Sequence, residues 1–221
     1  MSVVPASEPS EVPAPHPAVL VLGIGNVLWA DEGFGVRAVE ALHQRYAMPA
    51  NVSLIDGGTQ GVYLLDHVCS ADRVLVLDAI DYQLAPGTLR LFRDDEVPVW
   101  ADRAMSLHQA TFQELLSLAR VAGRFPQRIT LIGVQPEVLD DLGGSLSSRV
   151  RARLDEAVEL AVAELAGWGI EALQRTEPPD EPLGADALAL HAYEAGRPSA
   201  REACRIGDAR FLPVMRDGEG G

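Results

Sequence analysis

The stretch "LVLGIGNVLWADEGFGVRAVEAL", residues 20–42, predicts a buried strand that runs into a helix. Its first part is continuously apolar, as in a strand covered on both faces, and its last part has apolar residues at helical spacing. A turn between a strand and a helix often binds phosphate. This turn, however, carries Asp31 and Glu32 side by side, and two carboxylates repel an anion. The turn therefore predicts a site for a ligand other than phosphate.

The rest of the chain repeats this alternation of strands and helices. Four further apolar segments have the length and the turn signals of strands, at residues 52–56, 73–80, 87–93 and 128–136. Strands that alternate with helices are typical of an α/β fold. We therefore expect three layers, with a twisted, mostly parallel five-stranded sheet flanked by helices on both faces.

Composition divides the chain into three segments. Residues 1–17 are rich in Pro, Ser and Glu, and we expect a disordered leader there. Residues 18–175 are expected to form one α/β core, which a 221-residue chain with 48% hydrophobic residues can fill. Residues 176–221 are charged and interrupted by Pro and Gly. A mostly disordered tail is expected, with a partner-docking segment as the alternative.

Charge and residue usage exclude several classes of function. A net charge of −14 argues against a nucleic-acid partner, and the absence of lysine excludes a phosphate-binding or Schiff-base lysine. The two cysteines, Cys69 and Cys204, are too far apart in sequence to indicate a cysteine-based zinc site. No cationic leader precedes Arg37, and no apolar run approaches the ~20 residues that span a membrane. We expect a cytoplasmic protein.

Acidic residues follow three of the predicted strands. Glu32 comes after the first strand, Asp56 ends the second, Asp78 ends the third, and His108 lies at the entrance of a helix. Each residue alone has a structural explanation, such as helix-end electrostatics or capping of a turn. The carboxyl ends of parallel strands meet at one edge of a sheet, however. One imidazole and two carboxylates suit zinc, nickel or iron(II), so Glu32, Asp78 and His108 are the candidate metal ligands.

A dinucleotide-binding fold is the main competing interpretation. "GIGNVL" begins as Gly-x-Gly, and Asp56 stands where a ribose-binding acid would follow the second strand. The third glycine of that motif is missing, since Leu28 occupies its place. Two acids also precede the helix that would hold a pyrophosphate. The sequence therefore favours a cation site.

Seven stretches occur in an order that resembles a known family. They are "VLGIGNVLWADEGFGVRAVEAL", "DGGTQGVYLLD", "VLVLDAI", "APGTL", "DDEVP", "SLHQATFQELL" and "LIGVQPEVLDDLGGSLSSRV". Together they resemble the [NiFe]-hydrogenase maturation proteases over about residues 18–175.

The resemblance implies a task and a set of ligands. Such proteases cut a C-terminal extension from the hydrogenase large-subunit precursor after nickel has been inserted. The family's metal ligands fall on Glu32, Asp78 and His108. The nickel would be supplied by the precursor, and zinc or cadmium could take its place. The implied partners are the precursor and hydrogenase assembly chaperones, with the protein itself expected to be a monomer.

The way in which the peptide bond breaks is open at this point. A metal could polarise the carbonyl group or activate water. Alternatively, it only anchors the substrate, and Asp31 or Asp56 acts as the general base. Asn26 and the Gly57–Gly58 turn are candidates for stabilising an oxyanion. A non-catalytic, nickel-sensing assembly chaperone would use the same three ligands and is the alternative function.

Overall fold

The computed structural model describes residues 17–97 and 107–197, except for the side chains of 107–111. Its main sheet has five strands in the order β3-β1-β4-β6-β5. Four are parallel: β1 (Val19–Ile24), β3 (Val52–Gly58), β4 (Arg73–Ala79) and β6 (Arg128–Val134). The edge strand β5 (Leu89–Arg93) pairs with β6 in the antiparallel direction. The predicted five-stranded, mostly parallel sheet is confirmed.

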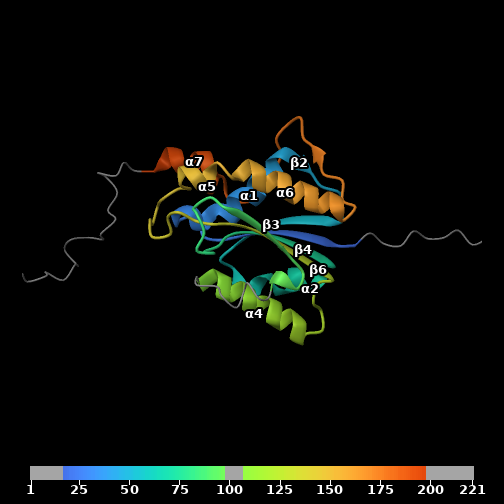
Figure 1. The fold of residues 1–221 in the computed structure, drawn as a ribbon. Coiled ribbons are helices and arrows are strands. Elements are labelled where there is room, and N and C mark those ends of the chain that lie inside the picture. The colour runs from blue at the N-terminus through green and yellow to red at the C-terminus, as the bar shows by residue number, and fades with distance from the viewer. Residues whose placement is uncertain (1–16, 98–106, 198–221) are drawn as a thin grey trace, which may run out of the picture.

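Helices cover both faces of this sheet, which gives the predicted three layers (Figure 1). One face carries α1 (Phe34–Arg45) and α6 (Leu154–Gly167), with the short α5 (Ser148–Arg151) and α7 (Leu190–Gly196) on the same side. The other face carries α2 (Leu65–Ser70) and α4 (Leu107–Val121). We call these faces the α1 side and the α4 side.

The remaining elements are short. Three 3-10 turns lie at η1 (Ala30–Gly33), η2 (Gly61–Leu64) and η3 (Asp186–Leu188). A separate two-stranded antiparallel sheet joins β2 (Tyr46–Ala47) to β7 (Leu173–Gln174). Within the described ranges, no helix has the length and apolar character needed to cross a membrane.

Strand β1 shows why the sheet has two cores. All six of its residues are buried, and alternate side chains point to opposite faces. Val19 and Val21 pack in the core on the α1 side, whereas Leu20 and Leu22 pack on the α4 side. Each such buried side chain contributes about 1.5–3 kcal/mol to the stability of the fold. The continuous apolar run in the sequence is therefore the signature of a strand with helices on both faces.

Two glycines allow the acidic turn to pack closely on the strand ends. Gly25 has a φ of +128°, and a Cβ atom there would lie 1.8 Å from the carbonyl oxygen of Glu32. A Cβ atom on Gly35 would lie 2.1 Å from the carbonyl oxygen of Leu77. Only glycine allows such approaches. The glycines around this turn thus bring Glu32 and the first turn of α1 against the ends of β1 and β4.

The described part of the tail, residues 176–197, differs from the predicted disorder. It contains η3 and α7, and Leu183 and Leu190 pack against the core on the α1 side. The buried Arg37 also donates a hydrogen bond to the carbonyl oxygen of Leu188. These few contacts offset the cost of ordering a segment that has little apolar surface. The leader up to residue 16 and residues 198–221 lie outside the described residues.

Candidate functional site

Glu32 and Asp78 form a pair of interacting carboxylates at the carboxyl edge of the sheet. Asp78 is almost completely buried, and its Oδ1 atom accepts a hydrogen bond of 2.7 Å from the backbone N–H of Ala79. Burial raises the pKa of Asp78 well above its ordinary value, the Ala79 hydrogen bond lowers it, and the charge of Glu32 raises it again. Burial also raises the pKa of Glu32. A cation between the two would favour the charged form of both.

The alternation of side chains places Asp78 on the α4 side. Val74 and Val76, which precede it at even positions along β4, belong to the core on that side. Helix α4 includes His108 in its first turn, four residues before the buried Phe112. Positions four residues apart share one face of a helix. The side chain of His108 itself lies outside the described residues.

The donor set fits a divalent cation as far as it is described. No three His, Cys, Asp or Glu side chains of the described residues are placed to hold a metal ion together. The side chain of His108, the third predicted ligand, is outside that set. Two carboxylates that disfavour each other's charge, with an imidazole to join them from α4, would suit nickel or zinc. The assignment of Glu32, Asp78 and His108 as ligands stays a prediction.

Asp31, the neighbour of Glu32, has a structural role. Its side chain is fully buried and accepts three backbone hydrogen bonds, from Glu137 at 2.8 Å, Val138 at 2.9 Å and Ser147 at 2.6 Å. These bonds tie the loop after β6 to the turn that carries Glu32. Because these three hydrogen bonds engage the Asp31 carboxylate within the fold, the geometry does not favour Asp31 as the general base.

Asp56 points to the opposite face of the sheet from Asp78. It follows Leu54 by two residues along β3, and Leu54 packs on the α1 side. Burial raises the pKa of Asp56, whereas a hydrogen bond from the Gly58 backbone and the charge of Arg37 lower it. The structure therefore groups Asp56 with Arg37 and separates it from the Glu32–Asp78 pair.

Asn26 shapes the turn after β1. Its Oδ1 atom accepts a hydrogen bond of 3.0 Å from the backbone of Leu28, and its carbonyl oxygen accepts one of 3.0 Å from Trp29. The Gly58 N–H, a candidate oxyanion donor, already donates a hydrogen bond to Asp56. A contribution of Asn26 to oxyanion binding stays a prediction.

Tyr82 and Gln135 lie near this pair of carboxylates, and the sequence did not suggest them. The ring of Tyr82 lies over Gly133, where a Cβ atom would come within 2.0 Å of the phenolic oxygen. Burial raises the pKa of Tyr82, and the charge of Asp78 raises it further. The Gln135 side-chain oxygen accepts a hydrogen bond of 2.7 Å from the Tyr82 backbone. Gln135 follows the apolar strand β6, so the same strand-end signal that marked Asp78 could have found it.

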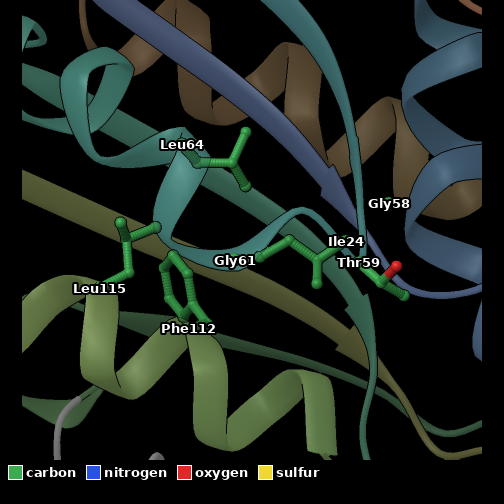
Figure 2. Close-up of a pocket in the computed structure, with 7 residues that line it drawn as sticks. All are labelled: Ile24, Gly58, Thr59, Gly61, Leu64, Phe112 and Leu115. Carbon is green, nitrogen blue, oxygen red and sulfur yellow. The ribbon is translucent and has the colours of Figure 1, made fainter.

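An apolar pocket opens on the α4 side of the same edge (Figure 2). Phe112 and Leu115 of α4 face Leu64 of η2 and the strand end at Ile24. Gly58, Thr59 and Gly61 complete its lining. Its volume of about 10 Å³ has room for roughly one water molecule, which is too little for a side chain of a bound peptide.

Comparison with known proteins shows the family. The hydrogenase maturation protease family model matches residues 36–164. A hydrogenase expression/formation protein, HoxM of Azotobacter vinelandii, is 54% identical over 198 residues, which cover 89% of this chain and 95% of that protein. The chain belongs to the hydrogenase maturation proteases. It is thus a hydrogenase maturation endopeptidase, and the dinucleotide-binding alternative receives no support.

The solved structure of the hydrogenase maturating endopeptidase HybD from Escherichia coli has the same fold. It is 43% identical, with a TM-score of 0.69, over 72% of this chain and 98% of that chain. The hydrogenase 2 maturation protease of Escherichia coli is 44% identical over 158 residues, or 96% of its length.

These matches differ in how far they extend along the chain. The match with HoxM covers 89% of this chain. Even if the match begins at the first residue, it therefore extends beyond residue 195 and includes α7. The 158 residues matched in the Escherichia coli protease suffice for the core of residues 18–175, but not for the core and the tail together.

Proposed function

We propose that this protease removes the C-terminal extension of a [NiFe]-hydrogenase large-subunit precursor after nickel insertion. It would recognise the nickel through Glu32, Asp78 and His108. The nickel belongs to the substrate in this proposal, and zinc or cadmium would occupy the same ligands in vitro. The expected cytoplasmic location and monomeric state are kept, and size-exclusion chromatography would test the latter.

The observation that carries the proposal is the coupling of Glu32 with the buried Asp78. A buried carboxylate beside a second carboxylate is costly unless a cation joins them. A precursor that already holds nickel would bring this cation to the sheet edge. A precursor without nickel would bring none, and its scissile bond would not be held in place.

Neither Asp31 nor Asp56 is suited to proton transfer in this proposal. Asp31 is engaged by backbone donors, and Asp56 faces the α1 side. We therefore propose that Asp78 acts as a ligand, and that the substrate's nickel, held by Glu32, Asp78 and His108, would polarise the scissile carbonyl group or activate the attacking water.

A nickel-sensing chaperone that does not cut its partner is the second candidate. The same ligands would serve it, because binding requires no proton transfer. Membership of a protease family favours cleavage.

The decisive experiment incubates purified large-subunit precursor, with and without nickel, with wild type and with His108→Ala. Mass spectrometry reports loss of the C-terminal peptide. We expect cleavage of the nickel-loaded precursor by wild type alone. Cleavage that does not depend on nickel would retain the protease and exclude nickel recognition. Nickel-dependent binding without any cleavage by wild type would establish the chaperone instead.

A further inference from the structure

Helix α7, in the tail, contacts the loop that follows β6. The Tyr193 hydroxyl donates a hydrogen bond of 3.3 Å to the carbonyl oxygen of Gly144. The Ser145 hydroxyl donates one of 2.6 Å to the Glu194 carboxylate, which also forms an ion pair with Arg151 of α5. We call residues 137–147 the β6 loop. An isolated seven-residue helix is unstable in water, so these contacts hold α7 on the loop.

The β6 loop is bonded in turn to the segment that carries Glu32. The Gly143 N–H donates to the carbonyl oxygen of Leu28 at 2.7 Å. Asp31 accepts hydrogen bonds from the backbone at both ends of the loop, Glu137 and Ser147. A continuous set of hydrogen bonds therefore runs from α7, through the β6 loop, to the residue preceding Glu32.

The β6 loop also exposes apolar surface beside this site. Leu142 is 58% exposed, Leu139 is 37% exposed, and the neighbouring Leu28 is 43% exposed. A short bridge pairs Trp29 with Leu142 and Gly144, which holds Leu28 and Leu142 at the same edge. Exposed leucines beside a catalytic site are typical of a surface that binds a protein substrate.

We propose that α7 is a positioning element for precursor binding, with Glu194 as its principal residue. It fixes the β6 loop so that Leu139, Leu142 and the Glu32 turn contact the precursor together. This inference rests on the proposed function and adds a role for the tail. The tail up to about residue 195 is within the match to HoxM, whereas the Escherichia coli hydrogenase 2 protease is too short to match core and tail together. The segment that forms α7 is thus shared with some family members, and in this proposal it contributes to the choice of precursor.

Two measurements on the full chain test the proposal. Hydrogen exchange of the Glu137, Val138 and Ser147 amides reports the β6 loop without any substrate. Steady-state cleavage of nickel-loaded precursor reports KM and kcat. The variants are Glu194→Ala and Glu194→Gln, which keeps an acceptor for Ser145. The matched control is Glu177→Ala, which removes an exposed tail carboxylate that forms no ion pair or side-chain hydrogen bond with the residues that the structure describes.

We expect Glu194→Ala to speed exchange at these amides and to raise KM at least about fivefold, the lower end of ordinary coupling between sites. The kcat of this variant should stay within about twofold of the wild-type kcat. The KM of Glu194→Gln should lie between those of wild type and Glu194→Ala. Glu177→Ala should have the wild-type KM, kcat and amide exchange. A purely structural role would lower the active fraction, and so kcat, with KM unchanged; that result overturns the inference.

The failures of the two proposals are distinguishable. If wild type cleaves the precursor and Glu194→Ala has the wild-type KM, only the role of α7 is wrong. If wild type neither cleaves nor binds the nickel-loaded precursor, the proposed function falls, and the inference falls with it. Unchanged amide exchange in Glu194→Ala overturns the connection between α7 and the loop in either case.

Discussion

On the α4 side of the sheet edge, the buried Asp78 meets the charge of Glu32, whereas on the α1 side Asp56 and Glu40 meet the guanidinium of Arg37. Burial raises the pKa of the carboxylates on both sides. The neighbouring charges differ. The charge of Glu32 adds to the effect of burial on the pKa of Asp78, whereas the charge of Arg37 lowers the pKa of both Asp56 and Glu40 and acts on Glu40 more strongly than the charge of Asp56, which raises it.

This difference between the two sides indicates which acids have a functional role. The α1 side carries its own cation, and Arg37 donates to Glu40 at 2.9 Å and to the tail at Leu188. Its acids are thereby accounted for by the fold. The α4 side holds two acids whose negative charges repel each other. This arrangement costs stability and is typical of sites that bind or transfer a cation or a proton.

The largest effect is expected where the two sides are compared by activity. Asp78→Asn should reduce cleavage of nickel-loaded precursor by more than the roughly 10–100-fold that loss of an outer hydrogen-bond partner of a metal ligand costs. Asp56→Asn should have a much smaller effect, because Asp56 lies on the other face. Initial rates measured by mass spectrometry decide the matter. Equal losses in the two variants would contradict the separation of the two sides.

Asp31→Asn should instead affect stability. In the variant, the amide NH₂ group would replace one carboxylate oxygen and face a backbone N–H group that donates to that oxygen in wild type. The lost hydrogen bond and the two facing donors should lower the free energy of unfolding by at least about 2 kcal/mol. Urea unfolding with an unchanged m-value measures this. Asp140→Asn, an exposed acid in the same loop, should stay within about 0.5 kcal/mol of wild type. A loss of the same size in both variants would remove the special role of Asp31.

Asp78→Asn should stabilise the fold while it abolishes activity. A folded-state pKa above the unfolded value means that the charged side chain destabilises the folded protein at neutral pH. Asparagine keeps the acceptor for the Ala79 N–H. The gain at pH 7 should lie in the roughly 0.5–2 kcal/mol range of single stabilising substitutions. Thermal or urea unfolding checks it, and a less stable variant would show that Asp78 is not under electrostatic strain.

Glu164 is a buried acid whose charge is compensated by a partner, and its substitution measures how much such a pair contributes to stability. Burial would raise its pKa, but hydrogen bonds from Arg93 and Thr130 outweigh burial and lower it. The resulting stability is present above the unfolded pKa of Glu and is lost as the pH falls through the lower folded pKa. Glu164→Gln should cost about 1 kcal/mol at pH 7, since Arg93 is half exposed. Unfolding curves should show this difference shrinking below pH ~4; a difference that is constant with pH would contradict the sign.

Much of the site could be predicted because strand ends are visible in a sequence. The acids after β1 and at the end of β4 follow apolar runs, and parallel strands share one edge. Because side chains alternate between the two faces of a strand, Asp56 and Asp78 point to opposite faces of the sheet. This can be deduced only when the register of β3 against β1 is known. Gly23 of β1 pairs with Asp56 on one side and with Leu77 on the other.

Other features depend on contacts between distant segments. The three donors to Asp31 come from more than 100 residues away. The sequence predicts a mostly disordered tail because its few apolar residues give no periodic signal. The order of residues 176–197 depends on partners in α1, α5 and the β6 loop, which composition does not reveal.

The central claim is that the α4-side acids contact the nickel of the precursor. X-ray absorption at the nickel edge tests it most directly, on nickel-loaded precursor with proline after the scissile bond to slow cleavage. The spectrum would be recorded alone, with wild type and with the Glu32→Gln/Asp78→Asn double variant. We predict that nickel gains oxygen or nitrogen ligands in the wild-type complex and gains none with the double variant. An identical nickel spectrum in the free precursor and in the wild-type complex would contradict the account.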